Sequence, residues 1–312
     1  MSEPVDHWER QTLEKVALAS ITEQRRARKW GIFFKIAGFI YLFIVLFLVM
    51  GWTDRTGLPN TKAHTALVTL EGVIAPGSQA SAERMIEGLQ TAFKAKNVKG
   101  VILRINSPGG SPVQAGQIND EIKRLKAQNP KIPLYVVVDD ICASGGYYVA
   151  VAADKIYVDK ASLVGSIGVL MDGFGFTGTM EKLGVERRLL TAGENKGFLD
   201  PFSPVNPVQK EHVLAMLGEI HKQFIDTVKA GRGARLKQTE GMFSGLIWTG
   251  VRSVELGLAD AYGSTESVAR DVIKAEDIVD YTPHQSLADR FAKRLGAASA
   301  EALVSSMSTQ LR

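Results

Sequence analysis

The sequence contains little cysteine and little histidine, and this scarcity excludes whole classes of site. Its 312 residues include one cysteine, Cys142, and five histidines. A single cysteine can support neither a disulfide framework nor a multi-cysteine zinc site. No histidines show the HExxH spacing of a metalloprotease, so we expect no metal-dependent mechanism.

Net charge is also small. The 37 Lys and Arg residues nearly balance the 33 Asp and Glu residues, which leaves a formal charge of +4. This excess does not indicate a nucleic-acid partner. With 45% apolar and 22% charged residues, the composition excludes a disordered or collagen-like chain, and the length suffices for a substantial core.

A long apolar run at residues 31–52 reads GIFFKIAGFIYLFIVLFLVMGW. At about 1.5 Å per residue a helix of this length crosses the roughly 30 Å core of a bilayer. Trp30 and Trp52 lie at its ends, as in an aromatic belt, and Lys35 can snorkel to the headgroups. A cleaved signal peptide and a buried core helix are the alternatives. A long polar segment precedes the run and no small-residue cleavage site follows it, so we predict a retained transmembrane helix.

The charges that flank this run predict its orientation. Asp54 and Arg55 on the C-terminal side cancel, whereas the N-terminal side is strongly basic. The basic residues are Arg25, Arg26, Arg28 and Lys29. By the positive-inside rule, residues 1–30 are cytoplasmic in an inner-membrane protein. Everything after a linker at residues 53–65 is then periplasmic, where an unpaired, buried Cys142 is acceptable.

Beyond the linker, short apolar runs alternate with helical periodicity. Predicted strands cover residues 66–74, 98–105, 133–138, 155–158, 163–170 and 185–191, and predicted helices cover residues 81–94, 113–128, 143–153, 207–230 and 253–257. This alternation predicts an α/β domain with a mostly parallel sheet over residues 66–275. In the C-terminal extension, residues 276–312, the helical spacing of Leu287, Phe291 and Leu295 indicates either a packing or assembly surface or a membrane-lying helix.

Two loops follow successive predicted strands, and functional groups gather at the carboxyl ends of such strands. The first reads NSPGGS, in which Gly109 and Gly110 permit positive φ, so that backbone amides can point into a cleft. The second reads DDICASGGYY and places Ser144 between a buried strand and a helix of small residues. A tight turn and a helix N-cap are the purely structural alternatives. Together, the loops can supply a serine nucleophile and amides for an oxyanion.

A serine nucleophile needs a base, and the sequence offers two kinds. Lys196 follows a predicted strand among glycines and apolar residues, where a lysine shielded from water can act as a neutral base. Every histidine is distant from Ser144 in sequence, although distant residues can meet in a fold. His7 lies near the basic N-terminus and His64 near the linker. His212 and His221 lie on one predicted polar helix, and His284 lies in a C-terminal loop. Spacing alone leaves both kinds of base open.

The motifs INSPGGS, DxxCASGGYYVA, GSIGV, AGENKGFLDPFSP and WTGVRSVELGLAD occur in this order and resemble the signal peptide peptidase A family, including its SohB-type relatives. The resemblance covers about residues 66–272. In length and organisation the chain is similar to the short, single-domain form of the family, which has one membrane anchor. The resemblance implies a serine–lysine peptidase on a crotonase- or Clp-protease-like fold, with no metal, nucleotide or other cofactor. It gives the nucleophile role to Ser144, the base role to Lys196 and a lysine-orienting hydroxyl to Ser166. It gives the oxyanion amides to Gly109 or Gly110, with Gly145.

The resemblance also implies substrates and partners. These are signal peptides left in the membrane after preprotein cleavage, other unfolded or membrane-released peptides, and copies of the chain itself in a closed ring. In such a ring Ser144 and Lys196 come from neighbouring protomers. A crotonase-like acyl-thioester enzyme and a non-catalytic membrane scaffold are the alternatives. The anchor and the Ser144 motif argue against the first, and serine-directed labelling tests the second.

Overall fold

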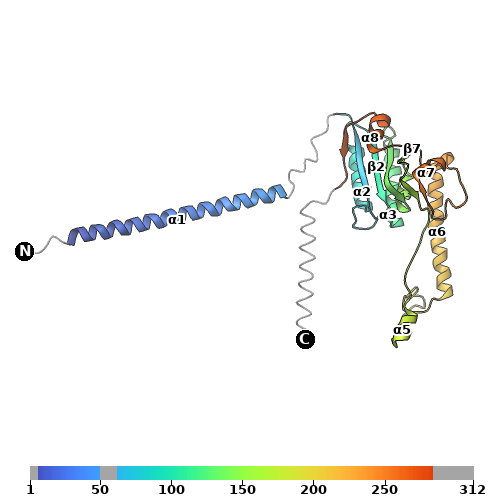
Figure 1. Cartoon of the computed structure of the whole chain (residues 1–312), viewed down its shortest axis with the longest axis horizontal. Helices are drawn as coiled ribbons and strands as arrows, with labels where there is room; N and C mark the ends of the chain where they lie inside the picture. Colours follow the sequence, from blue (N-terminus) through green and yellow to red (C-terminus); the bar gives the residue numbers. More distant parts are fainter. Residues whose placement is uncertain (1–5, 50–61, 284–312) are drawn as a thin grey trace, which may run out of the picture. The chain divides into compact units, whose positions relative to one another are not determined.

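The computed structural model describes residues 6–49 and 62–283, and the chain divides into two compact units. One unit holds the N-terminal helix α1, and the other holds every further described element (Figure 1). Each unit is therefore described by itself. The described residues do not include His284, the C-terminal apolar residues Leu287, Phe291 and Leu295, or residues 50–61.

Helix α1 is one continuous helix of 44 residues, Asp6–Val49. Within the described residues, the stretch Gln11–Leu46 is the one segment long and apolar enough to cross a membrane. Its large apolar side chains are exposed in the chain alone, as expected for a surface that faces lipid. Length and composition therefore fit a single-pass anchor, and they also fit a signal sequence. The end of the predicted span, with Trp52, lies outside the described residues.

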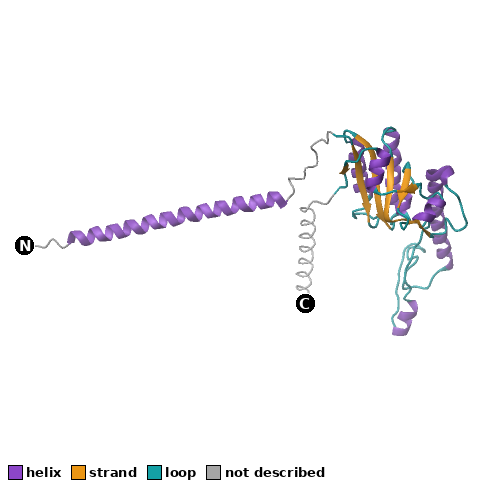
Figure 2. Cartoon of the chain, turned by 45° about the horizontal axis from the view of Figure 1, so that its top comes forward, coloured by secondary structure: helices purple, strands orange, loops and turns teal. Residues whose placement is uncertain are grey.

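The second unit is built on an eight-stranded sheet (Figure 2). Its strands are β1 (His64–Glu71), β2 (Val98–Ser107), β3 (Leu134–Ala143), β4 (Lys155–Val158), β5 (Leu163–Gly165), β6 (Ile247–Thr249), β7 (Ala261–Tyr262) and β8 (Ile278–Asp280). The main order is β6-β5-β3-β2-β1-β8, and β4 pairs with β3 and β7. Every pair is parallel except β5 with β6. The predicted α/β fold with a mostly parallel sheet is confirmed.

Helices cover both faces of this sheet. They are α2 (Ala82–Lys94), α3 (Pro112–Gln128), α4 (Gly145–Ala150), α5 (Thr177–Leu183), α6 (Pro207–Arg232), α7 (Gly250–Glu255) and α8 (Thr265–Ser267), with a 3-10 turn η1 (Gly233–Arg235) and a π-helical turn η2 (Val268–Ile273). The main core lies between the sheet and α2, α3, α4 and α6, and a smaller cluster lies under η2. Successive side chains of β2 point to opposite faces of the sheet. Val101 and Leu103 belong to the main core, and Ile102 belongs to the smaller cluster. The strands are therefore apolar on both faces, which explains their continuous apolar runs.

Two strand predictions in the middle of the chain were wrong. Residues 185–191 form no strand, and the strand predicted at residues 163–170 ends at Gly165. The apolar pattern is present at Leu189 and Leu190, but within the described residues it pairs with no neighbouring strand, and both side chains are exposed. β8 was also missed. It extends the sheet at β1, in a segment that the sequence assigned to a C-terminal extension.

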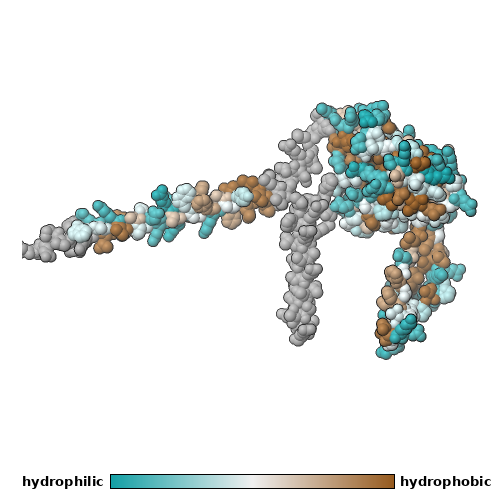
Figure 3. Space-filling view, in the orientation of Figure 1, coloured by the Kyte–Doolittle hydropathy of each residue, from teal (hydrophilic) through white to brown (hydrophobic). Residues whose placement is uncertain are grey.

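We call residues 170–206 the arm. No residue in this segment is buried, and its helix α5 lies away from the sheet (Figure 1). Its exposed large apolar residues are Leu170, Met171, Phe174, Phe176, Leu183, Val185, Leu189, Leu190, Phe198, Leu199, Phe202 and Val205. The space-filling view shows apolar surface along the arm (Figure 3). Contiguous exposed apolar surface of this kind marks an interaction site.

Candidate active site

Ser144 sits at the turn between β3 and α4 with a backbone φ of 50° and ψ of −122°. A non-glycine residue with positive φ is strained and persists only where its surroundings fix it. Here the Ser144 N–H donates to the Gly165 carbonyl oxygen (2.8 Å), and the Tyr148 N–H donates to the Ser144 carbonyl oxygen (2.9 Å). The Ser144 hydroxyl does not cap α4. The N-cap alternative therefore does not account for this side chain.

Glycines allow the two sequence-predicted loops to touch. A Cβ added to Gly146 would lie 3.1 Å from the Ser107 carbonyl oxygen, and one added to Gly145 would lie 3.2 Å from the Gly110 nitrogen. The sheet register places Ser107 beside Cys142, so both loops leave the same edge. The expected meeting of these loops at the carboxyl ends of β2 and β3 is confirmed.

The SPGG turn is fixed by backbone hydrogen bonds. The Ile74 N–H donates to the Gly109 carbonyl oxygen (2.8 Å), and the Ser111 N–H donates to the Ile74 carbonyl oxygen (2.8 Å). The Gly109 N–H donates to the Ser107 hydroxyl (3.1 Å). In the part of the chain that the structure describes, the N–H groups of Gly110 and Gly145 donate no hydrogen bond. Two adjacent amides are therefore available to a ligand beside Ser144.

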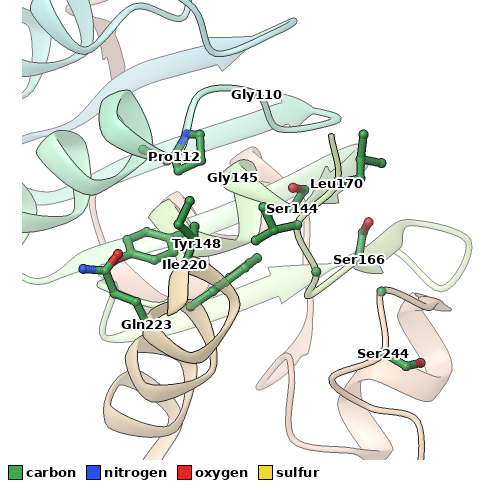
Figure 4. A pocket seen from close by; sticks show the side chains of 15 residues that line it. Gly110, Pro112, Ser144, Gly145, Tyr148, Ser166, Leu170, Ile220, Gln223 and Ser244 are labelled. Carbon is green, nitrogen blue, oxygen red and sulfur yellow. The ribbon is translucent and has the colours of Figure 1, made fainter. Parts of the chain in front are cut away.

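A cavity of about 550 Å³ opens beside these amides and is lined by Ser144, Gly110, Gly145 and Ser166 among others (Figure 4). Its apolar wall comes from Tyr148 on α4 and from Ile220 and Phe224 on α6. The ring centroids of Tyr148 and Phe224 are 5.2 Å apart, and the Thr227 and Tyr148 hydroxyls are hydrogen-bonded at 3.1 Å. The site can therefore hold an apolar side chain next to a serine hydroxyl.

Ser166 follows β5 and also has a positive φ, 50°. Its N–H donates to the Leu246 carbonyl oxygen at 2.8 Å, which ties it to the segment before β6. The preceding Gly165 is required because an added Cβ would lie 3.0 Å from the Trp248 ring. Ser166 and Ser144 are both among the residues that line the cavity (Figure 4).

No histidine of the described ranges lines this cavity. His64 is fully buried between the Lys62 carbonyl oxygen (3.1 Å) and the Tyr281 hydroxyl (2.9 Å), and His212 is exposed. His221 is partly buried and contacts the Ile167 carbonyl oxygen at 3.1 Å, so its polar, solvated setting was predicted incorrectly. The side chain of His7 and all of His284 lie outside the described residues.

Lys196 lies on the arm, and the chain alone does not bring it to Ser144. Its side chain is exposed and does not line the cavity. Within the described residues its amine makes no hydrogen bond and no ion pair. The single chain thus assembles Ser144, Ser166 and the glycine amides, and leaves the predicted base apart from them.

A buried ion pair anchors α6, the helix that supplies the cavity wall. The Arg232 guanidinium is 2% exposed, lies 2.8 Å from an Asp260 carboxylate oxygen and donates to the Gly257 carbonyl oxygen at 2.7 Å. Burial alone would raise the pKa of Asp260, but hydrogen bonds from Arg232 and from the Ile156 N–H outweigh it and lower that pKa.

Near the nucleophile, burial raises the pKa of the Cys142 thiol, which keeps it neutral and inert.

No group of three or more His, Cys, Asp or Glu residues that could hold a metal ion occurs within residues 6–49 and 62–283.

Comparisons with known proteins identify relatives. A sequence model of peptidase family S49 matches residues 126–278. A Brucella melitensis protein named Na(+)/H(+) antiporter NhaA is 42% identical over 216 residues, which are 69% of this chain and 29% of that protein. The chain therefore spans less than a third of the length of that relative. A Methanocaldococcus jannaschii protein named as a candidate protease is 32% identical over 213 residues, 67% of this chain and 68% of that protein.

Among solved structures, a point mutant of ClpP1 from Listeria monocytogenes is similar with a TM-score of 0.42 and 16% sequence identity, covering 64% of this chain and 92% of that chain. The family resemblance inferred from the five motifs is confirmed by the sequence relatives. The chain belongs to peptidase family S49, a family of serine peptidases.

Proposed function

We propose that this chain is a membrane-anchored serine endopeptidase with Ser144 as its nucleophile. One observation carries the proposal. Ser144 lies on a strained turn at the edge of a cavity, and its hydroxyl does not cap α4; within the described residues the neighbouring N–H groups of Gly110 and Gly145 donate no hydrogen bond. Such a pair of donors next to a serine hydroxyl suits the negatively charged oxygen of a tetrahedral intermediate.

The hydrogen bonds favour Gly110 over Gly109 as the first oxyanion donor. The Gly109 N–H is already used by the Ser107 hydroxyl, whereas the Gly110 N–H is free among the described residues. Gly145, the residue after the nucleophile, supplies the second N–H. The oxyanion site is therefore formed by one amide from each loop.

We assign the general base to Lys196 of a second copy of this chain. No lysine and no histidine of the described residues lines the cavity, so a single chain lacks a base there. The arm carries Lys196 and a large exposed apolar surface, which a neighbouring copy would cover. A head-to-tail interface that repeats around an axis closes into a ring. In it, the Ser166 hydroxyl would orient the incoming amine.

The chemistry then needs only side chains and water. The neutral Lys196 amine takes the Ser144 proton as Oγ attacks the peptide carbonyl, and the lysine returns that proton to the leaving amine. Water hydrolyses the acyl-enzyme, with Lys196 again as base. Only the unprotonated amine can accept the proton, so activity is expected to rise towards alkaline pH.

The proposed substrates are remnant signal peptides and other unfolded or membrane-released peptides. The cavity wall of Tyr148, Ile220 and Phe224 suits the apolar side chains of such peptides. The α1 anchor would hold the domain near them, with residues 1–30 in the cytoplasm and the peptidase domain in the periplasm. Membership of a peptidase family disfavours the acyl-thioester alternative, and a non-catalytic scaffold remains to be tested.

Labelling of the full-length chain with a fluorophosphonate separates a peptidase from a scaffold. The wild-type protein should be labelled at Ser144 and should cleave an apolar peptide, and Ser144→Ala should do neither. Lys196→Ala should lose nearly all cleavage, whereas the matched control Lys182→Ala, another exposed arm lysine, should keep it. A wild-type protein that is folded, oligomeric and unlabelled would be a scaffold.

A further inference from the structure

Ser107 carries a buried hydroxyl to which the proposed chemistry gives no role. The residue is 0% exposed and ends β2, just before the glycines of the SPGG turn. Its hydroxyl donates to the Gly72 carbonyl oxygen at 2.6 Å and accepts from the Gly109 N–H at 3.1 Å. One side chain thus joins the exit of β1 to the turn that follows β2.

The Ser107 hydroxyl restrains a side of the turn that the Ile74 backbone does not hold. Ile74 holds the Gly109 carbonyl oxygen and the Ser111 N–H, whereas the Ser107 hydroxyl holds the Gly109 N–H. The next N–H along the chain, that of Gly110, donates no hydrogen bond within the described residues. Gly109 and Gly110 have φ values of 100° and 146°, and glycine explores such conformations freely unless something fixes it.

The turn lies directly against the nucleophile. A Cβ built on Gly109 would come within 2.6 Å of the Gly145 nitrogen and 2.7 Å of the Ser144 Cβ. A small rotation of the Gly109–Gly110 peptides would therefore change the position of the Gly110 N–H relative to the Gly145 N–H. Preorganised donors stabilise an oxyanion only while they keep their relative positions.

We propose that Ser107 is a positioning residue whose hydroxyl fixes the SPGG turn, so that the Gly110 and Gly145 N–H groups form one oxyanion site. The inference rests on the proposed function, because it presupposes that Ser144 attacks a carbonyl. Loss of the hydroxyl leaves the Gly72 carbonyl oxygen and the Gly109 N–H without their buried partner, so the Gly109 peptide is held only through its bond to Ile74.

Because the oxyanion exists only in the transition state and the intermediate, the defect should fall on kcat. Removal of a whole oxyanion donor costs about 100- to 1,000-fold in kcat. A donor that is displaced and not removed should cost less. For Ser107→Ala we expect a fall of about 10- to 100-fold in kcat with KM changed by less than about twofold.

The chain offers a matched control in Ser162. This serine is 2% exposed, and its hydroxyl donates to the Asp139 carbonyl oxygen at 2.6 Å and accepts from the Asp159 N–H at 3.0 Å. It makes the same two kinds of bond as Ser107 and does not line the cavity beside Ser144. Ser162→Ala therefore measures what the loss of such a pair costs in stability alone.

The test compares the full-length wild type with Ser107→Ala, Ser107→Cys and Ser162→Ala in a peptidase assay and in binding of a peptide aldehyde. The aldehyde forms a tetrahedral adduct with the Ser144 hydroxyl and places an oxyanion in the site. Ser107→Cys keeps the packing but has a weak donor and acceptor, so it stays informative if Ser107→Ala fails to fold. We expect both Ser107 variants to lose kcat and aldehyde affinity by a similar factor, and Ser162→Ala to keep both.

Equal losses of kcat in Ser107→Cys and Ser162→Ala would overturn the inference, as would a defect confined to KM or an unchanged aldehyde affinity. Failure of the proposed function has a different signature. In that case the wild type itself shows no cleavage, no aldehyde binding and no labelling of Ser144, and the inference falls with it.

Discussion

Backbone strain and glycine packing around Ser144 decide which polar groups face the cavity. Ser144 and Ser166 both have φ values of 50°, and each is held by a hydrogen bond from its own N–H. The sequence predicts the serine, the small helix after it and the neighbouring glycine turn, because small residues at strand ends are a local signal. It could not separate Gly109 from Gly110, because that choice depends on the hydroxyl of Ser107 and on Ile74, which approach through tertiary structure.

Gly110→Ala should remove activity and lower stability. The backbone has a φ of 146°, and the added Cβ would collide with the Ile74 carbonyl oxygen. A strained residue of this kind costs about 1–3 kcal/mol, and the turn would move away from Ser144. Kinetics and chemical denaturation check both effects. Gly116→Ala on α3, where the added Cβ meets nothing within 4 Å, is the control and should be neutral or slightly stabilising.

The Arg232–Asp260 pair should make stability depend on acid pH. The Asp260 pKa is lowered in the folded chain, so its contribution is complete above the unfolded pKa of about 3.9 and is lost as the pH falls through the folded value. Asp260→Asn leaves Arg232 buried without a counter-ion and should cost about 3–5 kcal/mol at pH 7. Denaturation at pH 7 and pH 3 should show a smaller pH-dependent loss for Asp260→Asn than for the wild type. An equal loss would mean that this pair does not contribute.

At the scale of elements, α6 and the arm supply different parts of the proposed site. Helix α6 gives the cavity its wall, and the arm carries Lys196 on an exposed apolar surface. The long periodic helices and buried strands are predictable from sequence because local pattern and burial agree. The arm is not predictable, since residues 185–191 carry a strand-like pattern but pair with no strand among the described residues. An apolar pattern without a neighbouring strand indicates an exposed apolar surface, but it does not identify the partner of that surface.

Leu190→Asp should break the assembly and leave the protomer folded. The side chain is 95% exposed in the single chain, so the substitution disturbs no core. Size measurement of the full-length protein in detergent should show a smaller species with little peptidase activity and an unchanged melting temperature. Val272→Asp on η2, an exposed position outside the arm, should keep the assembly and the activity. An active Leu190→Asp monomer would contradict the role given to the arm.

At the scale of the whole molecule, one apolar helix and one α/β domain follow directly from composition and periodicity. Helix α1 begins well before the predicted membrane span, because its polar half, which precedes residue 31, lacks the apolar signal that defined that span. The predicted topology depends on the basic cluster at Arg25–Lys29, which lies on α1 before the apolar run and acts together with the membrane.

A reporter fused after Arg312 tests that topology. A reporter that is active only in the periplasm should function, and a cytoplasmic reporter should not. Replacement of Arg25, Arg26, Arg28 and Lys29 by neutral residues should weaken this preference. Cytoplasmic activity of the unaltered fusion would overturn both the compartment and the proposed substrate class.

The central claim is that the nucleophile of one chain works with the lysine of another, and subunit mixing tests it most directly. Ser144→Ala and Lys196→Ala chains, each inactive alone, are co-assembled, and peptidase activity is measured together with proof of subunit exchange. The account predicts partial recovery, because some interfaces then pair an intact Ser144 with an intact Lys196. Mixed assemblies that stay inactive, or a Lys196→Ala protein that is active by itself, would contradict it.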